Sequence, residues 1–181
     1  MKWEFPWKKK KIKINKVKDI AKIAERVYNE NGEVCFVSAP GCDGDIVIRR
    51  DDNISAEAVT NYYPQIGVYE IVLGKNKEAC VDETMHELSH IYRRHLKNKK
   101  PNMESFLRQE MEAWLDSSYL VENKNILANG QWLAGIGNQA VKIYRKSPEQ
   151  VIRSMKKVVN NIGDLEISDK EWRIVETVLQ K

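Results

Sequence analysis

The sequence predicts an α+β fold: a helix, several short strands, and then helices that continue to the C-terminus. Apolar residues recur at helical spacing from about 16 to 29, where the Asn31-Gly32 pair provides a stop signal. Runs rich in β-branched residues follow, separated by turn residues. Near the C-terminus, two Ser-x-x-Gln/Glu capping boxes mark helix starts. This order indicates an α+β core with a short, antiparallel-type sheet, followed by a helical region.

Turn and capping signals place the individual elements. Strands are expected at 34–37, 45–49 and 68–73, with a short turn at 55–59 and a loop at 62–64. Helices are expected from about 76 to a point before Pro101, and at 102–121, 148–160 and 169–180. We therefore divide the chain into a basic flexible tail (1–15), a core (16–122) and a C-terminal helical region (123–181).

The most informative motif is an HExxH run, His86-Glu87-Leu88-Ser89-His90, inside an expected helix. Residues four apart share one face of a helix, so both imidazoles can point at the same ion. Two neutral histidines and a carboxylate hold zinc and leave a fourth position for water, whose proton Glu87 can take. The alternative is an amphipathic helix with two solvated histidines. The metal site is favoured because this helix holds all three histidines of the chain, His95 included.

A third ligand is expected in the helix at 102–121, where Glu110 and Glu112 compete. Residues three and four positions away share the face of a helical residue. These neighbours are Phe106, Leu107, Ala113 and Trp114 for Glu110, and Arg108, Gln109, Leu115 and Asp116 for Glu112. Glu110 therefore lies on the apolar face, where a carboxylate needs a cation or strong donors. We expect Glu110 to complete the metal site, and Glu112 to be a solvated residue near Arg108.

Together the two motifs resemble those of the ImmA/IrrE metallopeptidases. That family carries HELxH, then a glutamate followed three residues later by alanine, a small-residue pair and an apolar end, which matches 110–121 here. The segments 17–27, 69–74 and 141–151 resemble the opening helix, the strand before the active-site helix, and the helical pair after the core. The resemblance covers roughly 17–158 and is specific at the two zinc motifs.

Two positions depart from the family pattern. His95 matches a histidine that many members carry, but Arg94 stands where a glycine usually precedes it. Trp114 replaces the Asp or Asn that often follows the alanine and that would orient a ligand histidine. Asp116, Asp82 or a backbone carbonyl are the candidates to replace that partner.

The resemblance implies a small zincin-like metalloprotease core in which the HExxH helix and the glutamate-bearing helix follow the sheet. It implies a Zn²⁺-dependent metalloendopeptidase, associated with bacteria, phages or mobile elements, that cuts a helix-turn-helix transcriptional repressor. Composition and spacing do not identify a substrate. The run 68–73 is interpreted either as an edge strand to which an extended peptide adds, or as an ordinary core strand.

In this hypothesis Glu87 deprotonates the attacking water and then delivers the proton to the leaving amine. The oxyanion needs a second donor besides zinc. Four side chains in the chain have suitable chemistry, and the sequence does not choose among them: Tyr62, Tyr63, Tyr92 and His95.

Composition suggests a cytoplasmic protein. The chain has 181 residues, of which 42% are hydrophobic, and it contains no apolar run long enough for a transmembrane segment. Its three cysteines are odd in number and lack a paired metal-ligand spacing, and the first residues form no apolar leader. These features favour a reducing compartment.

Charge is concentrated in the first 18 residues, which carry a net +7, so the rest of the chain is about −3. The lysine-rich, aromatic segment 1–13 suits a membrane surface, nucleic acid or an acidic protein, although a solvated, mobile tail is the simpler interpretation.

Two other functions are retained as alternatives. In the first alternative, the C-terminal helices form a DNA-binding unit that uses Arg153, Lys156 and Lys157. In the second, the protein is a non-catalytic, zinc-containing regulatory module. Glu87 argues against the second, because a structural zinc site is normally closed by four protein ligands and needs no free carboxylate.

Overall fold

The computed structural model describes residues 12–15, 17–29, 32–39, 42–97, 100–120, 129–163 and 165–181. These residues form an α+β structure that divides into two compact units, Met1–Leu96 and Lys97–Lys181. The predicted α+β class is confirmed. The expected domain boundary near 122 and most of the basic tail (1–11) fall outside the described residues.

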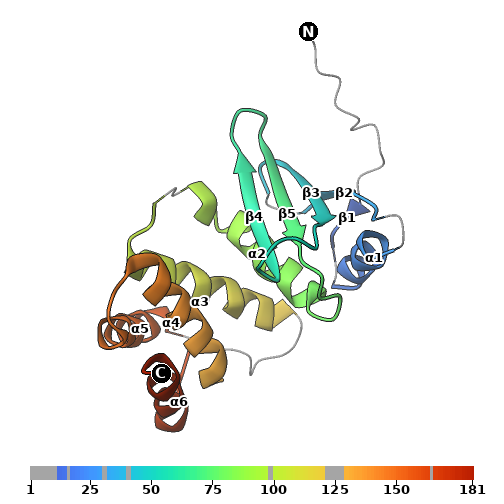
Figure 1. Cartoon of the computed structure of the whole chain (residues 1–181). Helices are drawn as coiled ribbons and strands as arrows, with labels where there is room; N and C mark the ends of the chain where they lie inside the picture. The colour runs from blue at the N-terminus through green and yellow to red at the C-terminus, as the bar shows by residue number, and fades with distance from the viewer. Residues whose placement is uncertain are drawn as a thin grey trace. The chain divides into compact units, whose positions relative to one another are not determined.

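The first unit is built on a five-stranded sheet with the strand order β1-β2-β3-β5-β4 (Figure 1). The strands are β1 (Ile12–Lys13), β2 (Cys35–Ser38), β3 (Asp45–Arg50), β4 (Ala58–Tyr63) and β5 (Val68–Leu73). β1 pairs with β2, and β3 with β5, in parallel, whereas the β2–β3 and β4–β5 pairings are antiparallel. The sheet is therefore mixed, and the expectation of an antiparallel-type sheet is wrong for half of its pairings.

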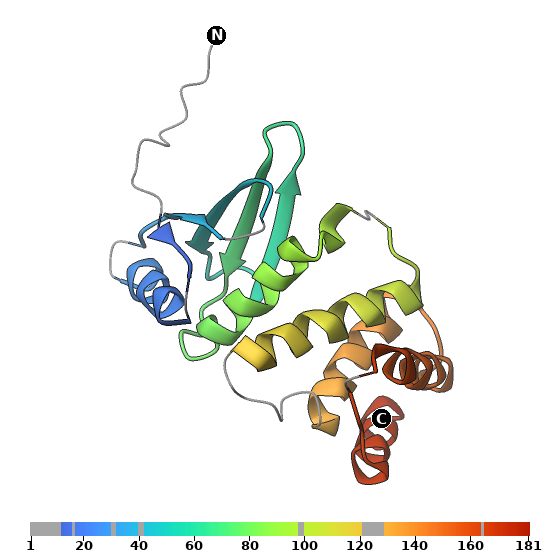
Figure 2. The same cartoon turned by 180° about the vertical axis from the view of Figure 1, so that it is seen from behind.

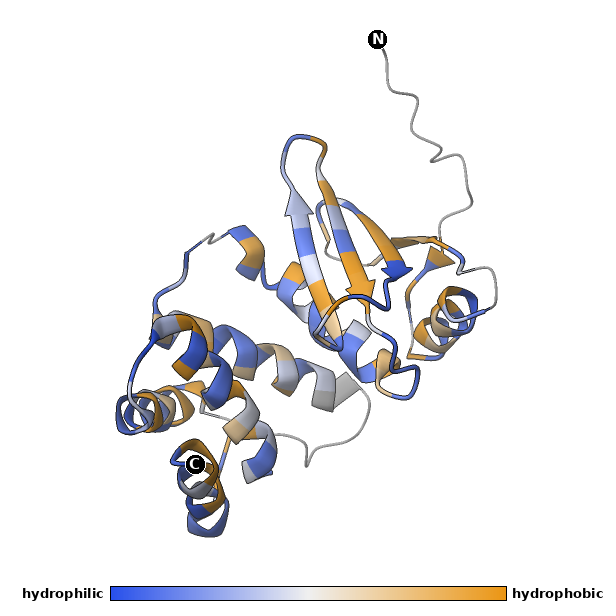
Figure 3. Ribbon diagram, in the orientation of Figure 1, coloured by the Kyte–Doolittle hydropathy of each residue, from blue (hydrophilic) through white to orange (hydrophobic). Residues whose placement is uncertain are grey.

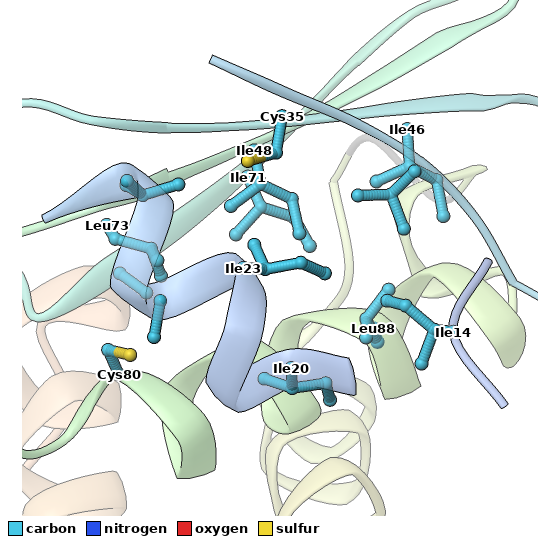
Figure 4. Close-up of a cluster of buried hydrophobic side chains, with 14 of the residues drawn as sticks. Ile14, Ile20, Ile23, Cys35, Ile46, Ile48, Ile71, Leu73, Cys80 and Leu88 are labelled. Carbon is cyan, nitrogen blue, oxygen red and sulfur yellow. The ribbon is translucent and has the colours of Figure 1, made fainter. Parts of the chain in front are cut away.

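Two helices, α1 (Val17–Val27) and α2 (Cys80–Tyr92), contact the sheet and each other. Alternate residues of the strands point toward these helices, and Figure 4 shows the resulting cluster of isoleucine, leucine and cysteine side chains. Its centre is formed by Ile23 of α1, Ile48 of β3 and Ile71 of β5, all fully buried. Burial of each such side chain is worth roughly 1.5–3 kcal/mol, so this contact holds α1 against the sheet, and Leu88 and Ile91 in the same cluster do so for α2.

The order of the strands decides between the two interpretations of 68–73 and corrects the expectation of a loop at 62–64. β5 pairs on both sides, so 68–73 is an interior strand and not an edge strand. Its two faces are both largely buried, as is typical of an interior strand. Tyr62 and Tyr63, expected in a loop, are the last residues of β4, and the turn begins at Pro64. β4 is therefore the edge strand at this side of the sheet.

Two boundaries also differ from the sequence prediction. Residues 12–14 were assigned to the flexible tail, but Ile12 and Lys13 pair with β2, and Ile14 is buried in the core. α2 begins at Cys80 rather than near 76, because a turn precedes it in which Asn76 accepts a hydrogen bond from the backbone N–H of Glu78.

The second unit is helical: α3 (Met103–Leu120), α4 (Gly130–Tyr144), α5 (Pro148–Ile162) and α6 (Asp169–Leu179). Figure 2 shows these helices from the opposite side, and in Figure 3 apolar and polar residues alternate around them. Each helix contributes apolar side chains to one buried core, among them Leu107, Leu133, Met155 and Val175. None of the helices in the described part of the chain combines the length and the apolar composition needed to cross a membrane.

Side-chain caps fix the starts of the last two helices. Ser147 and Gln150 form the predicted capping box in both directions, with Pro148 in the first turn. Ser168 accepts a hydrogen bond from the backbone N–H of Glu171, but the Glu171 carboxylate accepts from the N–H of Gly130 at the start of α4. The second predicted box is therefore half formed, because its glutamate joins α6 to α4.

Replacing Ser147 by alanine removes the acceptor for the Gln150 N–H, and we expect the second unit to lose about 1 kcal/mol of unfolding free energy. Urea denaturation followed by tryptophan fluorescence measures this, since Trp114, Trp132 and Trp172 all lie in this unit. Lys146→Ala, a change at the neighbouring exposed residue, is the control. Equal stability of Ser147→Ala and Lys146→Ala would contradict the assignment of the cap.

Candidate metal centre

Helix α2 buries polar side chains. His86, Glu87 and His90 are 5%, 8% and 7% exposed, and the adjacent Leu88 and Ile91 pack into the core of the first unit. A buried polar group is costly unless it is hydrogen-bonded, and a buried carboxylate requires a partner. The expectation of two solvated histidines on an amphipathic helix is therefore wrong.

The rings of His86 and His90 bring the same ring nitrogen, Nε2, next to each other. Their Nε2 atoms are 3.1 Å apart, and the ring planes are inclined at 80°. Two nitrogens that each lie 2.0–2.1 Å from one tetrahedral zinc ion are separated by about 3.3 Å. The distance between the Nε2 atoms is therefore close to that expected for two ligands of one ion.

The protonation state of His86 suits a ligand. Burial lowers the pKa of this imidazole from 6.5 to about 4, although the negative charge of Glu87 partly opposes the shift. His86 is consequently neutral near pH 7, and the neutral imidazole is the form that binds a metal ion.

Glu110 lies in α3 and is partly buried. Its neighbours in that helix behave as the sequence predicted: Leu107 and Ala113 are fully buried and Trp114 nearly so. Ligand atoms of His86, His90 and Glu110 all lie within 4.8 Å of one another, so this group is close enough to hold a metal ion. One carboxylate and two neutral imidazoles make a donor set that fits zinc.

Glu112 makes a different interaction. Its carboxylate accepts a hydrogen bond from the Nε of Arg108, one helical turn earlier, at 3.0 Å. The predicted pairing with Arg108 is confirmed, although the Glu112 side chain is only 18% exposed and so is less solvated than expected.

Glu87 has a partner that the sequence analysis missed. The hydroxyl of Thr60, on the edge strand β4, donates a short hydrogen bond to Glu87 Oε2. Thr60 and Ala58 point to the helix-covered face of the sheet, whereas Val59 between them is exposed. The alternation of side chains from 58 to 63 was the available signal, and the predictions of a turn and a loop on either side of Thr60 obscured it.

His90 is contacted on its other side by His95. The two Nδ1 atoms are 3.0 Å apart, and the ring planes are inclined at 72°. Trp114, which replaces the expected acidic partner, instead packs its ring against Trp132 in the helical unit. His95 is thus a partner of His90 that the sequence analysis did not consider in this role.

Position 94, where this chain has arginine and the family pattern has glycine, has the backbone conformation that places His95. Arg94 has a φ of 59°, a left-handed conformation that favours glycine. It ends α2 and leads directly into η1 (His95–Lys97), a short 3-10 helix. The Arg94 guanidinium lies 3.8 Å from the Asp43 carboxylate, an exposed ion pair.

The four candidates for the oxyanion donor differ in their surroundings. The Tyr63 hydroxyl donates to Glu70, and Tyr63 points to the opposite face of β4 from Thr60. Tyr92 is 61% exposed. Tyr62 lies on the same face as Thr60 and stacks on Tyr69. Of the three tyrosines, Tyr62 is therefore the one that shares a strand face with the partner of Glu87.

Comparison of the chain with protein-family models, with curated proteins and with solved structures found no match. The assignment to the ImmA/IrrE family therefore stays a prediction from the sequence motifs.

The left-handed conformation at Arg94 can be tested with two substitutions that both remove the ion pair with Asp43. We expect Arg94→Gly to be more stable than Arg94→Ala by about 1 kcal/mol, because only alanine keeps the steric cost of a positive φ. Urea denaturation monitored by circular dichroism measures the difference. The assignment fails if the alanine variant is as stable as the glycine variant.

Proposed function

We propose that this protein is a zinc-dependent metalloendopeptidase in which His86, His90 and Glu110 bind the metal and Glu87 is the general base. The observation that carries the proposal is the convergence of these three donors next to a carboxylate that is not needed as a ligand. Three protein donors leave a coordination position open, which is the arrangement of catalytic rather than structural zinc sites.

The chemistry follows from the position of Glu87. Zinc, when bound, supplies the Lewis acidity that makes water nucleophilic at neutral pH and polarises the substrate carbonyl. Glu87 takes one proton from the water as the new C–O bond forms, and gives it to the amine nitrogen as the C–N bond breaks. Thr60 donates a hydrogen bond to Oε2 of this carboxylate and would hold it in position for the proton transfer.

The substrate is proposed to be an extended segment of a protein. β4 is the edge strand of the sheet, and it carries Thr60, the partner of Glu87. A peptide that adds to β4 by backbone hydrogen bonds would therefore run beside the general base. This assigns to β4 the peptide-binding role that the sequence analysis gave to 68–73.

The resemblance to ImmA/IrrE metallopeptidases supports a helix-turn-helix transcriptional repressor as the protein that is cut. This substrate rests on the two zinc motifs alone.

The alternative of a DNA-binding module is less well supported. Of the three basic residues considered for it, Lys156 forms an ion pair with Glu176 at 2.8 Å, and Lys157 forms one with Glu104 at 2.8 Å. Lys156 also lies 5.3 Å from the centre of the Trp172 ring. These lysines already have anionic partners within their own unit, which weakens their attraction for phosphate.

Metal content tests the ligand assignment. We expect about one zinc ion per chain in the wild type and in Glu112→Ala, and a marked loss in Glu110→Ala and His86→Ala. Inductively coupled plasma mass spectrometry of protein dialysed against zinc-buffered solution gives the ratio. Glu112→Ala is the matched control, because it removes a carboxylate from the same helix. Equal zinc in both glutamate variants would contradict the role of Glu110.

Glu87→Gln separates catalysis from metal binding. Glutamine keeps the shape and an acceptor for Thr60 but is not a base, so we expect zinc to be retained and cleavage to fall by a factor on the order of 100 or more. The readout is the appearance of new N-termini in a library of proteome-derived peptides, identified by mass spectrometry. Cleavage by Glu87→Gln at the wild-type rate would refute the mechanism.

Thr60→Val removes the hydroxyl with little change of shape. We expect kcat to fall about 10-fold, because a hydrogen bond to a charged group is lost, while zinc content stays unchanged. Thr60→Ser keeps the donor and should retain most of the activity. If valine and serine variants have the same kcat on a peptide found in the library, Thr60 does not position the base.

A further inference from the structure

We propose that His95 is a positioning residue that accepts a hydrogen bond from Nδ1 of His90 and thereby fixes the ring that binds the metal. This inference rests on the proposed function of His90 as a ligand. The 3.0 Å separation of the two Nδ1 atoms is a hydrogen-bond distance, and His90 is 7% exposed. The contact is therefore partly buried, because His95 is half-buried beside the buried His90.

The two nitrogens of His90 have opposite roles in this arrangement. Nε2 faces Nε2 of His86, and Nδ1 faces His95. A neutral imidazole carries one proton, so if Nε2 offers its lone pair to a metal ion, the proton is on Nδ1. His90 then donates, and Nδ1 of His95 accepts. Metal-binding histidines usually donate this second N–H to a carboxylate or carbonyl, and the partner makes the ligand more basic and fixes its orientation.

The backbone at Arg94 makes this contact possible. If α2 continued past Tyr92, His95 would be about 140° around the helix axis from His90, because residues five apart are separated by that angle. Its ring would then point to a different side of the helix. The left-handed residue at 94 ends the helix and starts η1, which turns the ring of His95 back to His90.

The same geometry argues against other roles for His95. A fourth ligand would have to approach the metal from the side on which the Nε2 atoms of His86 and His90 meet, but His95 lies on the Nδ1 side of His90. The oxyanion must also form next to the metal, so the position of His95 does not suit the donor role considered from the sequence.

Zinc affinity of purified protein tests the inference without any measurement of cleavage. Asparagine and leucine have nearly the same shape, but only asparagine has an acceptor at the position of Nδ1. We expect His95→Leu to bind zinc about 10–100-fold more weakly than the wild type in competition with a chromophoric chelator, and His95→Asn to stay within a few-fold of the wild type. His95→Phe keeps a ring without an acceptor and should behave as leucine does.

A second readout reports on the ligand geometry itself. With Co²⁺ in place of zinc, the visible absorption bands of His95→Asn should match those of the wild type, whereas those of His95→Leu and His95→Phe should shift. Circular dichroism of the metal-free proteins identifies any variant that does not fold. The variants that do fold then test the role of His95. The inference would be overturned if folded His95→Leu or His95→Phe had the zinc affinity and the Co²⁺ spectrum of the wild type. It would also be overturned if His95→Asn lost as much zinc affinity as His95→Leu.

The controls separate this inference from the proposed function. If the wild type binds no zinc, or if Glu87→Gln cleaves as well as the wild type, the proposed function fails before His95 is considered. If the wild type binds zinc and cleaves peptides while all three His95 variants bind zinc equally well, only the role of His95 is wrong.

Discussion

The burial of His86, Glu87 and His90 on one side of α2 is the constraint on which the rest of the site depends. The helix is held against the sheet by Leu88 and Ile91, and this packing takes the neighbouring polar side chains out of water. Each of these side chains then needs partners of suitable chemistry. The hydroxyl of Thr60 at Glu87 and the ring of His95 at His90 are two such partners, and the proposed metal ion would be a third.

Those partners come from segments that are distant in sequence, and further contacts connect them around α2. Thr60 is on β4, where Tyr62 stacks on Tyr69 of the neighbouring strand β5. The Tyr69 hydroxyl donates to Asp43, and Asp43 in turn lies near the guanidinium of Arg94 at the end of α2. Thr60, the partner of Glu87, and Arg94, which precedes His95, are thus linked by one series of contacts that passes through β4 and β5.

Local patterns in the sequence predicted the parts of the site that depend on one helix at a time. The HExxH spacing gave the shared face of His86 and His90, and the apolar neighbours of Glu110 distinguished it from Glu112. The strands from β2 to β5 were harder to order, because pairing depends on contacts between distant segments. The sequence therefore leaves open whether β5 is an edge strand or a core strand, and it does not predict β4, since Pro64 suggests a loop where the strand in fact ends.

For a related reason, the spacing of residues in the sequence could not predict which side chains contact Glu87 and His90. Thr60 contacts Glu87, 27 positions away in the sequence, through the packing of α2 on β4, and His95 contacts His90 through one left-handed residue that breaks the helical periodicity. The arginine at 94 looked like a departure from the family pattern, yet its conformation is the one that glycine adopts most easily. In this conformation Arg94 forms an ion pair with Asp43. The conformation also brings His95 next to His90, and the positioning role proposed for His95 depends on this contact.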